Sequence, residues 1–254
     1  MRLLVTGPDG FIAKNMIGYL LSKGHVVEGY NYIENVLPNV EEYDWVIHLG
    51  AISDTTERDV EKVLEHNFEF SLRLLTLCDM CGTNLQYASS ASIYGNNREF
   101  SEDSNPYPMN PYAWSKYMFD RIVKLGGFNV LVQGFRYFNV YGDFEDHKGD
   151  QASPVTKFNK QAKSTGEIKL FENSEKYLRD FVCVEDVCRV HERFLTVDDS
   201  GIWNVGTGKP RSFREIAESI AAKESAKIIE IPMPDKLKNQ YQDYTCADLT
   251  KLNK

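Results

Sequence analysis

The chain opens with an apolar run that passes through a glycine turn into an amphipathic segment. Residues 1–7, MRLLVTG, have the composition of a strand buried on both faces, and GPDGFIAKNMIGYLLSKG continues with helical spacing. Further strand-like runs follow at 25–31, 43–51, 84–89 and 128–142, and helical patterns precede most of them. Strands that alternate with helices are typical of a parallel sheet covered by helices. The sequence therefore predicts an α/β fold.

The turn after the first strand has the spacing of a phosphate-binding loop. Gly7, Gly10 and Ala13 match the pattern GxxGxxG/A. The first glycine permits a tight turn, the second lets the backbone approach a pyrophosphate, and the small third residue lets helix and strand pack closely. The helix that follows offers N–H groups and a positive dipole end to phosphates. This pattern, placed between a strand and a helix, predicts a dinucleotide-binding site.

The segment after the second strand is unusually short. Residues 32–42 alone separate it from the third strand, which is too few for a crossover helix and a further strand. In the usual order 3-2-1-4-5-6, the missing piece would be strand 3 at the sheet edge. We therefore expect a Rossmann-type doubly wound parallel sheet that lacks edge strand 3. The residue that often binds the adenosine ribose falls at Asn31. This position has neither the acidic residue that binds the ribose hydroxyls nor a nearby basic residue that accepts a 2′-phosphate, so NAD and NADP both remain open.

The pattern changes at Asp143, where polar and loop-like residues begin. We expect residues 1–142, with a returning segment at about 181–198, to form the dinucleotide-binding domain. Residues 143–180 and 199–254 are expected to form a small C-terminal substrate-binding lobe. Such a lobe would cover the carboxyl edge of the sheet, where ligands of open α/β sheets bind. Within it, Ser212 and Glu215 predict a capped helix.

A candidate acid/base group lies between Tyr87 and Lys116. Tyr112 and Lys116 are four residues apart, so a helix would place both side chains on one face. A free tyrosine keeps its proton up to about pH 10, and a neighbouring cation favours the phenolate. Ser90, at the expected end of a strand, could donate a hydrogen bond to a reacting oxygen. Since YxxxK also occurs by chance on amphipathic helices, this pair is a candidate only.

Composition disfavours several function classes. The net charge is −8, and no basic run exceeds two residues, so neither nucleic acid nor an anionic membrane is an expected partner. No window approaches the roughly 18 apolar residues of a membrane span, and because the first residues read as a strand we expect no signal peptide. Five cysteines, an odd number, indicate reduced thiols and a cytoplasmic protein. Cys78 and Cys81 form a CxxC without a second pair at zinc spacing, so we expect no metal site.

Several motifs in order resemble a known family. TGPDGFIA, YASSASIYG, YAWSK and FRYFNVYG resemble the extended short-chain dehydrogenase/reductase family of nucleotide-sugar enzymes. Within it, HLGAISDTTE, HKG, KLFENSEKYLRDFV, NVGTG and PDKLKNQYQ are similar to the ADP-L-glycero-D-manno-heptose 6-epimerases over nearly the whole chain. The resemblance implies an isomerase of carbohydrate metabolism, in lipopolysaccharide biosynthesis, that works as a homo-oligomer. It also implies a tightly held NADP that oxidises sugar carbon C6 and reduces it from the other face.

The resemblance assigns roles to individual residues. Tyr112 and Lys148 are implied to be the two acid/base residues, Lys116 to hold the nicotinamide ribose and tune Tyr112, and Ser90 to bind the reacting oxygen. A lysine that acts as a base needs a lowered pKa, which desolvation can supply. The implied cofactor site contains Gly7, Gly10, Phe11, Ile12, Asn31, Leu49, Gly50, Ala51, Ile52, Ser53, Asn67, Tyr112, Lys116 and Val140.

The implied substrate site lies largely in the second half of the chain. Its residues are Ser90, Asn139, Asp150, Lys157, Phe171, Glu172, Asn173, Ser174, Arg179 and Tyr241. Arg179 suits a diphosphate because a guanidinium can bind two oxygens at once, although an ion pair with Asp180 is the alternative. His147 receives no chemistry and is interpreted as a loop residue.

Two departures from the family pattern leave alternatives open. The lysines that grip the 2′-phosphate in that family would lie in the missing segment after the second strand, so the NADP preference is in question. Asp150 replaces a small hydroxyl residue near the sugar. Another nucleotide-sugar epimerase, dehydratase or reductase, such as a UDP-hexose 4-epimerase, is therefore an alternative. A cofactor-binding regulatory protein without turnover is a third possibility, which the retained Tyr112 and Lys116 disfavour.

Overall fold

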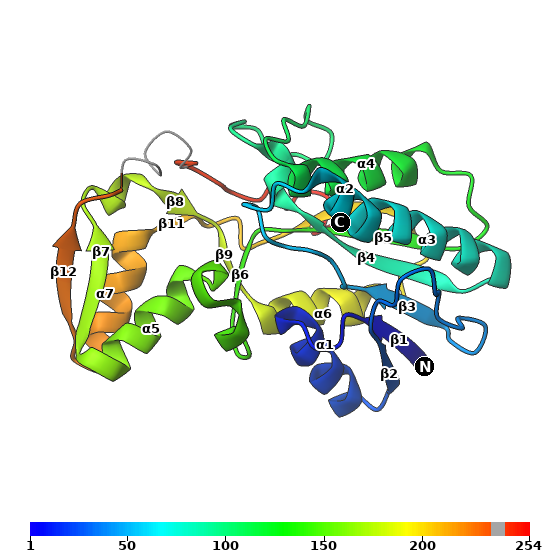
Figure 1. Cartoon of the computed structure of the whole chain (residues 1–254), viewed down its shortest axis with the longest axis horizontal. Helices are drawn as coiled ribbons and strands as arrows, with labels where there is room; N and C mark the ends of the chain where they lie inside the picture. Colours follow the sequence, from blue (N-terminus) through cyan, green and yellow to red (C-terminus); the bar gives the residue numbers. More distant parts are fainter. Residues whose placement is uncertain (235–241) are drawn as a thin grey trace.

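Six parallel strands form the central sheet of the protein (Figure 1). The structure, a computed structural model, describes residues 1–234 and 242–254, without the side chain of Asp150. The strand order is β10-β5-β4-β3-β1-β2. Among the described residues β2 is an edge strand next to β1, which confirms the Rossmann-type sheet without strand 3. The bounds are Gly201–Val205 (β10), Val132–Tyr137 (β5), Asn84–Ser90 (β4), Trp45–His48 (β3), Arg2–Thr6 (β1) and Val26–Tyr30 (β2).

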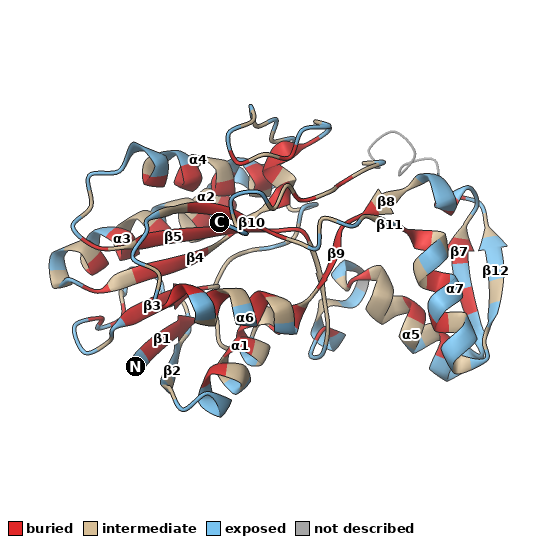
Figure 2. Cartoon of the chain, turned by 180° about the vertical axis from the view of Figure 1, so that it is seen from behind, coloured by how far each residue is buried: buried red, intermediate tan, exposed pale blue. Residues whose placement is uncertain are grey.

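Helices cover both faces of this sheet. Alternate residues of β1 point to opposite faces, so Leu3 and Val5 pack under α1 and α6, whereas Leu4 packs under α3 and α4. The central strands are buried along most of their length (Figure 2). In the described part of the chain, no helix has the length and apolar character needed to cross a bilayer. The bounds are Phe11–Ser22 (α1), Val60–Leu64 (α2), Glu65–Glu69 (η1, a π-helix), Phe70–Cys81 (α3), Pro111–Leu125 (α4) and Val184–Phe194 (α6).

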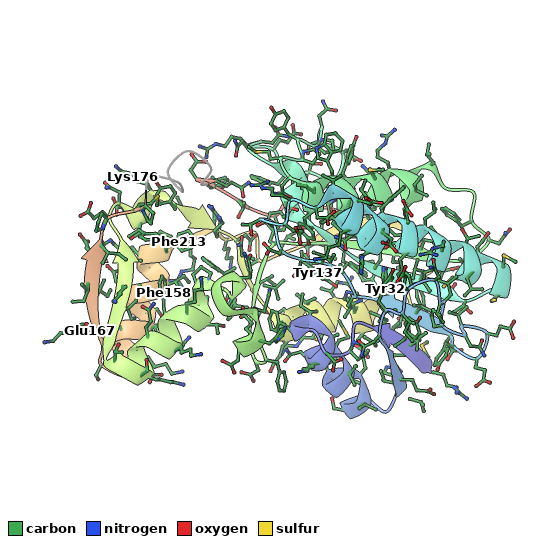
Figure 3. All side chains as sticks on the ribbon, in the orientation of Figure 1. Tyr32, Tyr137, Phe158, Glu167, Lys176 and Phe213 are labelled. Carbon is green, nitrogen blue, oxygen red and sulfur yellow. The ribbon has the colours of Figure 1, made fainter. Side chains whose placement is uncertain are left out.

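A smaller lobe stands beside the sheet (Figure 1). Its strands β7 (Glu167–Phe171) and β12 (Lys227–Ile231) pair in parallel, and helices α5 (Pro154–Thr165) and α7 (Phe213–Glu224) pack on them. Figure 3 labels Phe158 and Phe213, which belong to the same apolar cluster of this lobe. Ser212 and Glu215 form the expected capping box of α7.

Short elements connect the sheet to the lobe. β6 (Asn139–Tyr141) pairs with β9 (Phe181–Cys183), and β8 (Leu178–Arg179) pairs with β11 (Arg211–Ser212). Within residues 1–234 and 242–254, the 3₁₀ helices are η2 (Ala91–Tyr94), η3 (Asp146–Gln151) and η4 (Ser174–Lys176). Because β6 directly follows β5 at the carboxyl edge of the sheet, the chain enters the lobe from the edge where ligands of such folds bind.

The structure corrects one expected domain boundary. Residues 199–254 were expected to lie wholly in the lobe, but β10 pairs with β5 from Gly201 opposite Gln133 to Val205 opposite Tyr137. Ile202 and Trp203 pack into apolar clusters on opposite faces of the sheet, so β10 is buried on both faces. Lys251 Nζ also donates to the Ile202 carbonyl at 2.7 Å, which ties the end of the chain to this strand.

Candidate active site

The glycine turn brings two chain segments into close contact. Gly7 has a φ of +67°, and a Cβ at this position would lie 2.6 Å from Gly50 Cα. No other residue type fits this approach, because a side chain would be both strained and obstructed. Gly10 is the N-cap of α1, and no side chain caps the helix there. The first N–H groups of α1 are therefore available to an anionic ligand.

Two adjoining cavities lie at and next to this turn. The first, which we call the turn cavity, has a volume of about 220 Å³. The second, which we call the crevice, has a volume of about 270 Å³. The two cavities share the lining residues Phe11, Ile12, Ser53, Ser89, Tyr112, Tyr137 and Lys148.

Many of the residues that the sequence nominated line these two cavities. The turn cavity contains Gly7, Gly10, Phe11, Ile12, Leu49, Ala51, Ser53, Tyr112, Lys116 and Lys148, together with His147. The crevice adds Ser90, Asn139 and Val140. Four nominated cofactor residues line neither cavity. Gly50 abuts Gly7, Ile52 and Asn67 bond to each other, and Asn31 donates to Asp9.

The nominated substrate residues are divided between separate hollows. Lys157, Phe171 and Ser174 line a cavity of about 290 Å³ in the lobe, which we call the lobe cavity. Arg179 borders a further hollow of about 530 Å³ beside η2. Glu172 and Asn173 line none of these cavities, and Asn173 instead accepts a hydrogen bond from Lys176 at 3.0 Å. Tyr241 and the side chain of Asp150 lie outside the described residues.

Tyr112 and Lys116 occupy the first turns of α4, as expected. Asn110 caps this helix by accepting from Ala113 N at 2.8 Å. Lys116 Nζ lies 5.9 Å from the centroid of the Tyr112 ring. Burial lowers the pKa of Lys116 to about 8, against the opposing charge of Asp120. The charged form of Lys116 is therefore less favourable in the folded protein than in water, as is common for functional lysines.

The acidity of Tyr112 differs from the expectation. We expected Lys116 to lower the pKa of Tyr112, but burial raises this pKa, and only a hydrogen bond with Ser90 opposes the rise. The physical reason is that burial desolvates the phenolate, whereas Lys116 contributes no opposing shift to this pKa. Tyr112 therefore holds its proton at neutral pH.

Lys148, on η3, lines both the turn cavity and the crevice. Its Nζ lies 5.5 Å from the centroid of the Phe11 ring. Burial lowers the pKa of Lys148, and Glu145 opposes this shift. Glu145, which sequence reasoning missed, is 1% exposed. Its carboxylate accepts from Gly142 N at 3.0 Å, Ser153 N at 2.6 Å, Ser153 Oγ at 2.9 Å and Thr156 Oγ1 at 2.6 Å. Glu145 thus fastens both ends of the loop that carries Lys148.

Known proteins resemble this arrangement over most of the chain. The model of the NAD dependent epimerase/dehydratase family matches residues 3–206. The chain belongs to this family. The ADP-L-glycero-D-manno-heptose-6-epimerase of Helicobacter pylori is 28% identical, with a TM-score of 0.86 over 98% of this chain and 88% of that one. The UDP-glucose 4-epimerase of Thermus thermophilus, solved with NAD, is also 28% identical, with a TM-score of 0.80 over 100% of this chain and 91% of that one.

A third solved structure shows the same fold at lower identity. The UDP-N-acetylglucosamine 4-epimerase of Methanobrevibacter ruminantium is 20% identical, with a TM-score of 0.88 over 100% of this chain and 91% of that one. This structure and the present chain therefore share one fold.

In this member of the epimerase/dehydratase family, three buried serine hydroxyls have no partner among the described residues and belong to residues that line cavities. Ser92 lines the hollow beside η2, Ser89 lines both the turn cavity and the crevice, and Ser174 lines the lobe cavity. Ser89 and Ser174 are each 2% exposed. A buried hydroxyl without a hydrogen bond is costly, so each is a candidate ligand contact. Ser89 was missed because YASSASIYG contains several serines and their spacing alone does not identify which ones face a cavity.

Proposed function

We propose that this protein is a nucleotide-sugar epimerase that inverts a sugar carbon by transient oxidation and re-reduction with a bound NAD or NADP. The substrate that its motifs favour is ADP-glycero-manno-heptose, inverted at C6. One observation carries this proposal: Tyr112 and Lys148 come from different elements, and both line the same two adjoining cavities. Inversion needs a proton-transferring group for each stereoisomer, and two such groups flanking one space meet this requirement.

The turn fits a dinucleotide. A pyrophosphate needs close backbone approach and free N–H groups, and the contact between Gly7 and Gly50 and the uncapped start of α1 provide both. Lys116 at the wall of the turn cavity would hold the ribose hydroxyls next to the nicotinamide. The cofactor, when bound, supplies the reversible uptake of hydride from the sugar carbon.

The environments of Tyr112 and Lys148 suit complementary proton transfers. Burial raises the pKa of Tyr112 and lowers that of Lys148, so the phenol tends to keep its proton and the ammonium tends to release one. Such opposed shifts separate an acid from a base within one site. For one epimer, Lys148 Nζ would accept the hydroxyl proton and Tyr112 Oη would return a proton after inversion. For the other epimer the two groups exchange these tasks, and Ser90 would donate a hydrogen bond to the reacting oxygen.

The lobe cavity is proposed to hold the nucleoside part of the substrate. Phe171, Tyr177 and Phe213 supply aromatic surface, and Ser174 Oγ supplies a polar atom. A nucleobase offers the matching chemistry, with flat apolar faces and polar edges. The lobe cavity and the crevice lie on either side of Pro154, which lines both, so the two are neighbours.

The diphosphate is proposed to meet Arg179, which borders the hollow beside η2 and contacts the ring of Phe213 at the lobe cavity. The Arg179 guanidinium lies 5.5 Å from the centroid of the Phe213 ring and donates to the carbonyls of Leu178 and Gln242. The carboxylate of Asp180 accepts from Thr207 and Gly208, which supports a structural role for this acid rather than charge neutralisation of Arg179.

A second candidate is a UDP-hexose 4-epimerase. The Thermus thermophilus UDP-glucose 4-epimerase is as identical to this chain, at 28%, as the Helicobacter pylori heptose epimerase is. In both candidates Tyr112 and Lys148 would transfer the protons. The candidates differ in the nucleotide of the substrate and in the sugar carbon that faces Tyr112.

Two measurements on the purified full chain test the proposal. Mass spectrometry of the released dinucleotide shows whether one is bound, and NMR of ADP-, UDP- and GDP-sugars shows which one is inverted. Bound dinucleotide with inversion of ADP-heptose supports the first candidate, whereas inversion of UDP-hexose alone supports the second. Bound dinucleotide with no inversion of any sugar would favour a regulatory protein and refute both.

A further inference from the structure

We propose that this chain binds NAD in preference to NADP, because Asp9 of the glycine turn provides the carboxylate that meets the adenosine ribose. This inference rests on the proposed dinucleotide site and specifies which of the two cofactors that site accepts. It also names Asp9 as the residue that selects between NAD and NADP, a choice that Asn31 at the end of β2 does not make by itself.

Asp9 and Asn31 are bonded to each other across the turn. Asn31 Nδ2 donates to Asp9 Oδ2 at 2.8 Å, and both residues are exposed. The backbone fixes this pair, since Gly7 N donates to Tyr30 O at 2.9 Å. A Cβ on Gly29 would lie 2.8 Å from Pro8 Cβ, so the turn packs tightly against the end of β2. The position of Asp9 is therefore set by the fold and not by a flexible loop.

This position is where a Rossmann site meets the ribose. The residue at the end of the second strand usually contacts the 2′-hydroxyl, and in NAD enzymes it is commonly a carboxylate. Here that residue is Asn31, and the carboxylate comes from the turn beside it. A carboxylate can accept about four hydrogen bonds, so the bond from Asn31 leaves capacity for a ribose hydroxyl. A 2′-phosphate at the same place would meet the negative charge of Asp9 instead.

The residues that follow Asn31 add further negative charge. Glu34 is exposed in the next loop, and Tyr32 donates to Glu65 Oε1 at 3.0 Å. Burial, Glu65 and Glu34 raise the pKa of Tyr32, and Arg73 is the cation that opposes them. Glu34 and Glu65 therefore add negative charge around Tyr32, the residue that follows Asn31. Like charges a few ångströms apart repel each other even in water, so a dianionic 2′-phosphate beside Asp9 is disfavoured.

The test measures binding to the cofactor-free full chain by isothermal titration calorimetry. The probes are NAD, NADP and a fragment pair, 5′-AMP and adenosine 2′,5′-bisphosphate, which differ only in the 2′-phosphate. We expect the wild type to bind NAD at least about tenfold more tightly than NADP, with the same order for the fragments. Asp9→Asn is expected to tighten NADP by about fivefold and to weaken NAD by about threefold, because an amide oxygen accepts without charge.

Two further variants show whether the change in affinity depends on charge at the glycine turn or follows from a charge change anywhere on the protein. Asn31→Arg adds a cation and is expected to shift the preference toward NADP further than Asp9→Asn does. Asp198→Asn makes the same charge change at an exposed residue near the first residues of β3 and β4, at the opposite end of the sheet, and is expected to leave both affinities unchanged. The effect of Asp9→Asn should also shrink as salt increases, which a purely structural change would not do.

Each outcome bears on the inference. Equal or tighter binding of NADP by the wild type would overturn it, as would an unchanged NAD-to-NADP ratio in Asp9→Asn. If neither dinucleotide binds, the proposed dinucleotide site itself fails. The inference and the proposed function can thus be refuted separately.

Discussion

Asn67 holds the main chain of Ile52 with both atoms of its amide. Asn67 Oδ1 accepts from Ile52 N at 2.8 Å, and Asn67 Nδ2 donates to Ile52 O at 2.9 Å. Nδ2 also donates to Ser115 Oγ at 3.1 Å, and Ser115 Oγ donates to Tyr112 O at 2.8 Å. Asn67 lies in the π-helix η1, a kind of local distortion that is frequent at functional sites. It therefore links the loop after β3 to the start of α4, which carries the proposed acid/base residue Tyr112.

Asn67→Asp should loosen this link. The substitution removes two donated hydrogen bonds and buries a charge at a residue that is 1% exposed. We expect the free energy of unfolding to fall by about 3 kcal/mol and dinucleotide affinity to fall with it. Urea unfolding and calorimetry measure both. The control is Asn159→Asp, which loses one bond to Val155 O within α5 and should cost under about 1 kcal/mol. Equal losses in the two variants would contradict the role of Asn67.

Tyr112→Phe removes the phenol that we assign to proton transfer and keeps the ring. Turnover should fall by about 10²–10⁴-fold, the usual contribution of a general acid or base, while the dinucleotide stays bound. The matched control is Tyr117→Phe, whose ring packs 5.8 Å from that of Trp114 on the same helix. The steady-state rate and the bound dinucleotide content are measured for both variants, to test whether the Tyr112 phenol is needed for turnover but not for dinucleotide binding. Near-normal turnover in Tyr112→Phe would remove this residue from the mechanism.

Lys148→Met is expected to separate the two directions of the reaction. The variant keeps the apolar stem of Lys148 near Phe11 but lacks the ammonium, so inversion should slow by about 10²–10⁴-fold. One epimer still meets Tyr112 and should still reduce the bound cofactor, which near-ultraviolet absorbance detects, whereas the other epimer should not. Lys163→Met, at an exposed position in the last turn of α5, serves as the control. Normal inversion by Lys148→Met would show that another group supplies the second proton.

The buried ammonium of Lys116 predicts a pH-dependent stability. Burial lowers its pKa from 10.5 to about 8, so between these values the unfolded chain carries a proton that the folded chain has released. The cost of burying the charge, at most about 3 kcal/mol, is fully present below the folded pKa and disappears as pH rises toward the unfolded pKa.

Lys116→Met lacks this charge. At neutral pH it should be more stable than the wild type, and the difference should shrink as pH rises from about 8 to 10.5. Other titrating groups are common to both proteins, so they cancel in the difference. Urea unfolding of the two proteins across this pH range measures it. A difference that does not change with pH would show that the Lys116 ammonium is not desolvated as described.

Local patterns explain why much of the architecture was predictable. The turn at Gly7 and Gly10 follows from spacing along one strand and one helix, and the shared face of Tyr112 and Lys116 follows from the period of the helix. The length of residues 32–42 was enough to exclude strand 3. The capping box at Ser212 and Glu215 is equally local.

The remaining features depend on contacts between distant segments. The pairing of β10 with β5 joins residues that no local pattern connects, so Gly201–Val205 were assigned to the wrong part of the fold. The bond between Asn31 and Asp9 crosses the turn, and the four bonds to Glu145 depend on how its loop folds. The raised pKa of Tyr112 reflects burial, which YxxxK spacing does not report.

The fate of the hydrogen on the inverted carbon tests the mechanism most directly. The purified full chain is incubated with ADP-glycero-manno-heptose deuterated at C6 in ordinary water, and the product is analysed by NMR and mass spectrometry. Transient oxidation by a tightly held cofactor predicts an inverted product that keeps its deuterium at C6. An inverted product that has exchanged its deuterium for solvent hydrogen would contradict this mechanism, because it would require removal of the carbon-bound hydrogen as a proton.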